Sequence, residues 1–415
     1  MSSNSISQPV RRRRVFYIPG YDPFHPRRYR ELYRSEGAEQ ARISGYDLTL
    51  SPKTGKGRYG WHVSADIEGA QVETDVEVLV WSDIVKDSME SSILATYGQL
   101  MRTAWIYISS GALWRLMRLR KGPVIAALYP VVILLVQAVL ALLLAAGVAW
   151  GVGLLSAMLG VPGGLSLLLQ IVLGLGAAIA LLLAFKARDN KLFAYYLMHD
   201  YAYSAALYGR NPPELEARMA AFRGAIHDAL AQNAVDEVLV VGHSSGAHLG
   251  VSVLADLLRE GLPQDRPALS FLSLGQVVPM VSFLPQADRL RRDLQELSEQ
   301  EQIPWYDVTA PGDGCAFALC DPVAVSGVAR SAQRWPVVFS AAFTQSLSPA
   351  RWHALKRRYF RLHFQYLCAF DAPRDYDYFR ITAGPLTLGA RYRERGHSRS
   401  RLNRAVNRHT SVAPR

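Results

Sequence analysis

The chain of 415 residues is half hydrophobic and carries a formal net charge of +11. This length allows one large domain or two of ordinary size. The three cysteines, Cys315, Cys320 and Cys368, form no CxxC motif, and the sequence has no Cys/His spacing typical of a zinc site. Its basic segments also lack the signatures of RNA-binding modules, so we expect no nucleic-acid partner.

Arginine-rich segments lie at both ends of the sequence. Residues 1–14 finish with the run Arg11 to Arg14, and we expect them to form a basic N-terminal tail. Residues 392–415 contain seven arginines against one acidic residue, Glu394, and we expect a disordered arm there. Tails of this composition suit solvent or a surface of anionic lipid.

Strands and helices alternate through residues 15–122 and 186–391, which we interpret as one discontinuous α/β domain. Apolar runs predict five strands, at residues 14–18, 75–81, 237–241, 269–274 and 305–309. Residues 43–67 are predicted to form short antiparallel strands with a turn at 54–57. This alternation is typical of a mostly parallel sheet with helices on both faces and functional sites at the carboxyl ends of its strands.

A long apolar segment interrupts this domain. Residues 123–185 contain no Asp, Glu, Lys, Arg or His. Because a helix needs about 20 residues to cross the bilayer, the segment accommodates two spanning helices, at about 124–150 and 165–185. Glycine and proline are frequent in the join between them. The sequence therefore predicts a transmembrane hairpin inserted in the middle of the α/β domain.

The charges that flank the hairpin predict its orientation. Arg115, Arg118, Arg120 and Lys121 precede it, three further basic residues follow it, and the connecting turn is uncharged. Under the positive-inside rule both ends of the hairpin lie in the cytoplasm. We expect a multi-pass protein of the cytoplasmic (inner) membrane, with both termini and the α/β domain facing the cytoplasm.

A nucleophile-elbow pattern follows the third predicted strand. Residues 242–246 read Gly-His-Ser-Ser-Gly, directly after an apolar run and before a helical segment that stops at Gly261. In a strand–turn–helix setting this pattern presents a serine, here Ser244, at the tip of a strained turn. The other interpretation is a glycine-rich turn without chemistry.

With this elbow, the segment Phe16 to Tyr21, and the regions around Asp313 and His363, the chain resembles the α/β-hydrolase superfamily, and more loosely a membrane-inserted lipase or esterase. The resemblance covers most of the domain, but only the elbow is a specific motif. It implies an oxyanion hole formed by the backbone N–H of Ser245 and of Gly20 or Tyr21. Such enzymes commonly have His-Gly at that loop, whereas this chain has Pro19-Gly20.

The same resemblance implies an acid and a histidine in that order after the elbow. Asp313 follows the strand predicted at 305–309 and is the favoured acid, with Asp321 as the alternative. His363 is the favoured base. The other candidates are His353 within a predicted helix and, in the arginine-rich arm, His397 and His409.

These features predict a membrane-anchored serine hydrolase that acts on an ester or acyl substrate. Lipid-derived molecules are among the candidate substrates. No metal or organic cofactor is expected, and the sequence identifies no protein partner. The alternative is a catalytically inactive hydrolase-fold protein that serves as a membrane scaffold.

The predicted orientation is tested by a fusion after Arg415 to a reporter that is active only in the periplasm. Because the basic flanks hold both hairpin ends in the cytoplasm, we expect no reporter activity. A fusion that is active in the periplasm would show that the orientation is wrong.

Overall fold

The computed structural model of the chain describes residues 9–53, 57–89 and 92–413. The chain divides into two compact units. The first comprises residues 9–87, 107–123 and 207–413 and contains an α/β fold. The second comprises residues 88–106 and 124–206 and is helical. The turn predicted at residues 54–57 falls largely outside the described residues.

The first unit is built on one mixed sheet of eight strands within the described residues, in the order β2-β3-β4-β1-β5-β6-β7-β8. Strands β2, β3 and β4 are antiparallel neighbours, and every pairing from β4 through β1 to β8 is parallel. The strands are β1 (Arg12–Ile18), β2 (Asp47–Pro52), β3 (Gly60–Ile67), β4 (Ala70–Val78), β5 (Glu237–His243), β6 (Ala268–Leu274), β7 (Trp305–Thr309) and β8 (Val337–Ser340).

The five strands predicted from apolar runs are present, and the antiparallel pair predicted at residues 43–67 corresponds to β2 and β3. Strand β8 was not predicted, since its four residues follow Pro336 and are too few to show a period. Val238 and Val240 of β5 are fully buried, as are Leu239 and Val241 on the opposite face. Burial on both faces explains why β5 has an unbroken apolar run.

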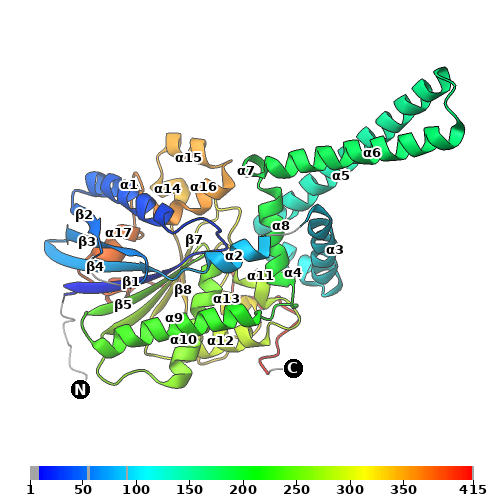
Figure 1. Ribbon diagram of the computed structural model, residues 1–415. Helices are drawn as coiled ribbons and strands as arrows, with labels where there is room; N and C mark the ends of the chain where they lie inside the picture. The colour runs from blue at the N-terminus through cyan, green and yellow to red at the C-terminus, as the bar shows by residue number, and fades with distance from the viewer. Residues whose placement is uncertain (1–8, 54–56, 90–91, 414–415) are drawn as a thin grey trace. The chain divides into compact units, whose positions relative to one another are not determined.

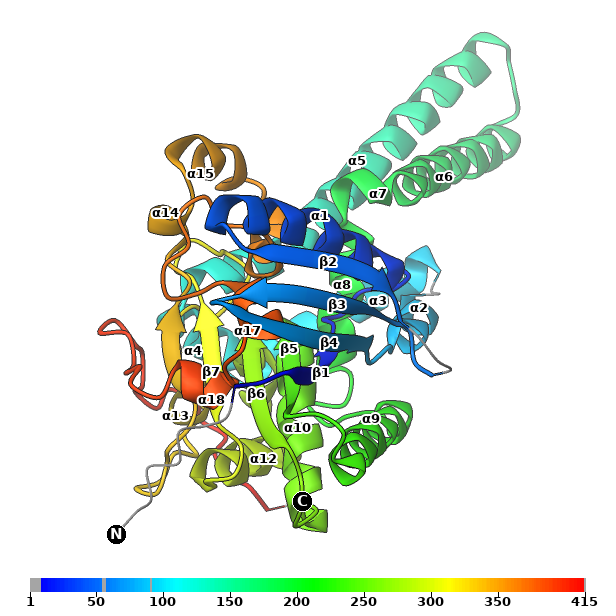
Figure 2. The same ribbon diagram turned by 90° about the vertical axis from the view of Figure 1, so that its left-hand side faces the viewer.

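Helices cover both faces of the sheet (Figures 1 and 2). Helices α9, α10 and α12 pack on one face, and α1 and α17 contact β1 to β4 on the other. The helices of this unit are α1 (Arg27–Ser44), α4 (Ala112–Leu119), α9 (Pro213–Gln232), α10 (Ser245–Glu260), α11 (Val278–Ser282), α12 (Asp288–Glu299), α13 (Pro322–Val325), α14 (Phe343–Ser346), α15 (Pro349–Leu355), α16 (Tyr359–His363), the 3-10 helix η1 (Gln365–Leu367), α17 (Tyr378–Ala383) and α18 (Leu388–Arg391).

The second unit contains the two helices predicted as the hairpin, α5 (Lys121–Met158) and α6 (Gly163–Ala187). Both are long and apolar enough to cross a membrane. Most large side chains along them are exposed, as lipid-facing residues would be, for example Leu142 at 69% and Leu143 at 64%. The first residues of α5 and the last residues of α3 belong to the first unit, so both helices are shared between the two units. The remaining helices are α2 (Ser82–Met89), whose last residues belong to the second unit, α3 (Ile93–Ser109), α7 (Asp189–Leu192) and α8 (Ala194–Ala205).

The second unit has a small core of its own beside the apolar pair. Leu134 of α5 is fully buried against Leu100 of α3 and Tyr195 and Met198 of α8. The Tyr97 hydroxyl donates a hydrogen bond to the Leu134 carbonyl at 2.9 Å. Helices α3 and α8, which the sequence assigns to the α/β domain, therefore pack with the start of the hairpin.

The described part of the predicted N-terminal tail is not a tail. Residues 12–14 belong to β1, and the Arg13 side chain is fully buried. Its Nε donates to Glu237 Oε2 at 2.7 Å, and its other nitrogens donate to the carbonyls of Gly384 and Leu386. A run of arginines suggested solvation, but one of the four neutralises a buried carboxylate.

The predicted disordered arm is also wrong for the described residues 392–413. The backbone N–H of Leu402 donates to Leu319 at 2.7 Å, and the Val406 N–H donates to Val325 at 3.2 Å. The Tyr392 ring is 5% exposed and lies 4.9 Å from the ring of Phe339. Residues 392–413 thus cover the α/β domain, because their backbone groups pair with loops that composition does not reveal.

We predict that Tyr392→Ala lowers the free energy of unfolding by about 3 kcal/mol, since it removes a buried aromatic ring. Thermal or denaturant unfolding of the purified protein measures this change. The exposed Arg399→Ala is the matched control and should be nearly neutral. Equal stability of the two variants would contradict the packed position of this segment.

Candidate active site

Ser244 lies at the carboxyl end of the central strand β5, where the chain turns into α10. Its backbone has φ 57° and ψ −121°, which is a strained conformation for a residue with a side chain. Its N–H donates to the Leu274 carbonyl at 2.9 Å, at the end of the neighbouring strand β6. This contact fixes the turn against the sheet and leaves the side chain at the sheet edge.

Two close backbone approaches make this turn possible. A Cβ added to Gly246 would lie 2.0 Å from the Ile18 carbonyl oxygen, so α10 can begin against the end of β1 only with glycine there. A Cβ on Gly20 would lie 2.9 Å from Ser244 Cβ and 3.3 Å from its Oγ. The loop after β1 therefore touches the Ser244 side chain.

The peptide between Pro19 and Gly20 is oriented by a tryptophan that the sequence did not single out. The indole Nε1 of Trp81 donates to the Pro19 carbonyl at 2.9 Å. In a trans peptide the C=O and N–H groups point in opposite directions. The Gly20 N–H therefore points away from Trp81. Tyr21 is 4% exposed and packs its ring edge-on against Trp81 at 6.0 Å.

Ser245 supplies another backbone donor. It is the first residue of α10, and N–H groups in the first turn of a helix have no acceptor within the helix. Ser245 and Gly20 thus flank Ser244 with backbone donors, the arrangement that can stabilise negative charge on a reacting oxygen.

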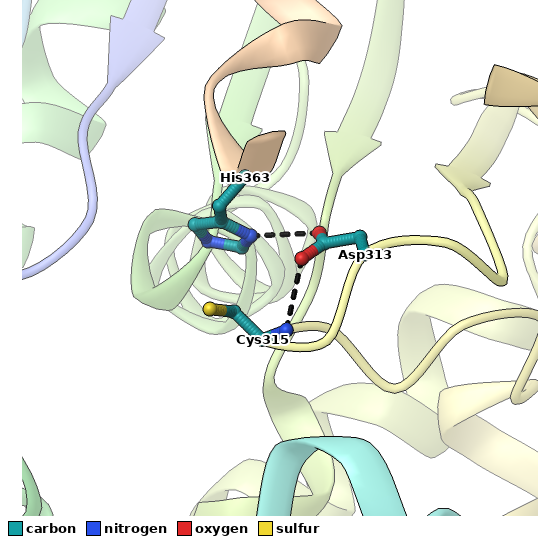
Figure 3. A group of neighbouring side chains, drawn as sticks. All are labelled: Asp313, Cys315 and His363. Atoms are coloured by element: carbon teal, nitrogen blue, oxygen red, sulfur yellow. Dashed lines mark hydrogen bonds and ion pairs between the residues drawn. The ribbon is translucent and has the colours of Figure 1, made fainter. Parts of the chain in front are cut away.

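Asp313 and His363 are brought together from different parts of the chain (Figure 3). His363 lies at the end of α16, and its Nδ1 is 2.8 Å from Asp313 Oδ2. Tyr366 donates its hydroxyl to the same oxygen at 3.0 Å, and the Cys315 N–H donates to Oδ1 at 2.9 Å. Both side chains are buried.

The surroundings of Asp313 favour its ionised form. Burial by itself would raise the pKa of this carboxyl, but the adjacent imidazole and the three hydrogen bonds outweigh burial and lower the pKa. A carboxylate beside Nδ1 favours the tautomer that has its proton on Nδ1, because that nitrogen can then donate to the carboxylate.

His363 also lies next to the end of β6. A Cβ on Gly275 would lie 3.1 Å from His363 Cε1, and Gly275 directly follows Leu274, whose carbonyl accepts the Ser244 N–H. On the other side, His243 Nε2 is 3.0 Å from the His363 carbonyl oxygen. Burial lowers the pKa of His243 to about 3, so this neighbour remains neutral.

The alternative acid, Asp321, has a different role in the fold. Its Oδ1 accepts from the N–H groups of Val323 and Ala324 at the start of α13, and its Oδ2 accepts from Gln333 at 3.0 Å. Among the described residues no histidine is hydrogen-bonded to Asp321. Asp313, not Asp321, is therefore the acid beside His363.

The other histidine candidates are not at this site. His353 is exposed on α15. His397 accepts the Val338 N–H, and His409 Nε2 is 3.3 Å from the Ser110 carbonyl oxygen. The partners that the sequence did not reveal are Trp81 and Tyr366, which make contacts between distant segments and belong to no motif. His243 lies within the elbow pattern, but its contact with the His363 carbonyl was not predicted.

Asp313, Cys315 and His363 are also the one group of possible metal ligands within the described residues. One ligand atom from each lies within 4.8 Å of the others. His363 Nδ1 and Asp313 are hydrogen-bonded to each other, so these two ligand groups are already paired. We therefore describe the cluster as a carboxylate–imidazole pair with the Cys315 thiol beside it.

Comparisons with protein-family models, with curated proteins and with solved structures find no match to this chain.

A third carboxyl near this edge, Asp307 of β7, predicts a pH dependence of stability. Asp307 is fully buried, and its Oδ1 accepts from Ser273 Oγ at 2.6 Å. Burial raises its pKa to about 8, whereas in the unfolded chain we expect a pKa of about 3.9.

Between pH 4 and 8 the unfolded chain therefore releases a proton that the folded protein keeps, and stability falls as the pH rises. We expect Asp307→Asn to reduce this fall, by up to several kcal/mol at about 1.4 kcal/mol per pKa unit. Unfolding at pH 5 and pH 8 measures the effect, with Asp66→Asn on β3 as the exposed control. A pH dependence as steep as that of the parent would contradict the assignment.

Proposed function

We propose that this protein is a membrane-anchored serine hydrolase of the esterase or lipase type, related to the α/β-hydrolases. The observation that carries the proposal is the 2.8 Å contact between His363 Nδ1 and Asp313, at the sheet edge where Ser244 has a positive φ. A strained serine and a buried carboxylate–imidazole pair at the same sheet edge support activation of the hydroxyl as a nucleophile, for which the imidazole must come within hydrogen-bonding distance of Ser244 Oγ.

In the proposed reaction Ser244 Oγ attacks the carbonyl carbon of an ester, and its proton passes to His363 Nε2. The carbonyl oxygen gains the negative charge, which the N–H groups of Ser245 and Gly20 stabilise. The tetrahedral intermediate then breaks the bond to the leaving alcohol, which takes the proton from His363. Water, deprotonated by the same imidazole, cleaves the acyl-serine and restores the hydroxyl.

Each remaining residue supports one step. Asp313 orients His363 and stabilises its protonated form, and Tyr366 holds Asp313 through the 3.0 Å hydrogen bond. Trp81 keeps the Pro19 carbonyl turned away so that the next N–H is available. A backbone donor held in this way supports an oxyanion hole although the loop reads Pro-Gly instead of His-Gly.

The proposed substrate is an ester or acyl compound from the bilayer. Helices α5 and α6 are long and apolar enough to cross a membrane, and they are inserted between β4 and the nucleophile strand β5. An enzyme tethered in this way is kept close to lipid substrates. The basic flanks of the hairpin support a cytoplasmic position for the domain.

The test is labelling of the full-length protein with a fluorophosphonate probe, which reacts with activated serines and needs no known substrate. We expect Ser244→Ala and His363→Ala each to abolish labelling without unfolding the protein. The double variant should lose no more than either single variant, since the residues act as a unit.

Asp313→Asn should slow labelling by a factor on the order of 10⁴, because the ring loses its orienting carboxylate. Asp321→Asn is the matched control and should label at nearly the parent rate where it folds. A chelator should have no effect. Labelling of Ser244→Ala as strong as that of the parent would end the catalytic proposal and favour a membrane scaffold.

A further inference from the structure

A cavity with a basic lining lies beside the helix that carries His363. It has a volume of about 250 Å³ and is bounded by α1, α15, α16 and the chain after α16. These helices lie on the same side of the sheet (Figure 1). The cavity is smaller than the roughly 300–1,000 Å³ of pockets for drug-sized ligands, so it suits a small ligand or a headgroup.

The charges that line this cavity do not balance. Its ionisable groups include the guanidinium groups of Arg351, Arg358 and Arg361 and one carboxylate, Glu36. Glu36 Oε2 is already used, because it accepts from Arg351 at 3.2 Å and from the Ala369 N–H at 2.9 Å.

Arg351 is therefore compensated, and it has a second partner in Asp371 at 3.3 Å. Arg358 and Arg361 have no carboxylate partner in the part of the chain that the structure describes. They add two positive charges to the lining of the cavity.

The rest of the lining adds no negative charge. Ala354 and Leu355 form an apolar wall, and Cys368 is 9% exposed. Burial, with Glu36 nearby, raises the pKa of the Cys368 thiol far above its usual range, so the thiol remains neutral. The cavity thus combines an apolar wall with two unpaired guanidinium groups.

We propose that this cavity binds a phosphate group, carried by a lipid headgroup or free in solution, through Arg358 and Arg361. The planar guanidinium fork matches phosphate oxygens better than an ammonium does, and paired forks give geometric specificity. Lys356 and Arg357, both exposed directly before these residues, raise the local positive potential.

Binding here has a consequence for the catalytic pair, and this consequence rests on the proposed function. Arg361 and His363 belong to the same five-residue helix, α16. Tyr359 of that helix packs on the loop that carries Asp313, where a Cβ on Gly314 would lie 3.0 Å from Tyr359 Cδ1. A ligand held by Arg361 would therefore bind to the element that carries the proposed base, His363.

The test uses the full-length protein in a zwitterionic detergent. Inorganic phosphate is titrated in one arm and short-chain phosphatidic acid in the other, and calorimetry measures binding. We expect saturable binding in at least one arm. Arg358→Gln with Arg361→Gln should weaken it at least tenfold, whereas Arg399→Gln with Arg404→Gln, two exposed arginines of residues 392–413, should leave it unchanged.

The two arms identify the source of the ligand. Equal binding of both probes supports a site for phosphate in general, and binding of the lipid alone supports a headgroup site. Absence of saturable binding in both arms, or equal loss in both double variants, overturns the proposal. If the Gln variant does not fold, Arg358→Lys with Arg361→Lys should still weaken binding severalfold, because it keeps the charge and loses the fork.

Fluorophosphonate labelling is measured separately, so failure of the phosphate site and failure of the hydrolase proposal remain distinguishable.

Discussion

The contact between the start of α10 and the end of β1 is the constraint on which the candidate site depends. Because Gly246 has no Cβ, the helix can begin directly against the Ile18 carbonyl. Ser244 is then forced into its positive φ, and the loop after β1 is pressed against its side chain. The strain at Ser244, of order 1–3 kcal/mol, persists because the strands on both sides of β5 hold the turn in place.

The parallel part of the sheet explains why residues from four distant segments meet. Strands β1, β5, β6 and β7 run in the same direction and end at one edge. The loop with Gly20, the turn with Ser244 and the loop with Asp313 therefore emerge side by side. His363 lies at the end of α16. Its ring contacts the Asp313 carboxylate, and its backbone carbonyl contacts the ring of His243.

Asp307, Asp313 and Asp321 lie close together in sequence, but their different surroundings give them different pKa values and different roles. Among the described residues Asp307 has one hydroxyl donor and no ion-pair partner, and burial raises its pKa to about 8. Asp321 is used to begin α13, and burial raises its pKa as well. Only Asp313 combines an imidazole with hydroxyl and backbone donors, and its pKa is lowered. The candidate acid is therefore the carboxyl whose ionised form the structure stabilises.

The amino-acid sequence by itself determined the features that depend on local pattern. Continuous apolar runs predicted five strands, an uncharged segment predicted the two long apolar helices, and the spacing Gly-His-Ser-Ser-Gly placed Ser244 between a strand and a helix. These signals are local because side-chain periodicity, hydropathy and glycine spacing act within a few residues along the chain.

Only the tertiary structure decided between Asp313 and Asp321, brought Trp81 to the Pro19 carbonyl, and packed residues 392–413 onto the domain. The same is true of the buried pair of Arg13 and Glu237. In each case the partners are far apart in sequence. Composition indicates how well water solvates a segment. Whether that segment packs on the domain depends on the buried polar groups of other segments that need a hydrogen-bond or charge partner.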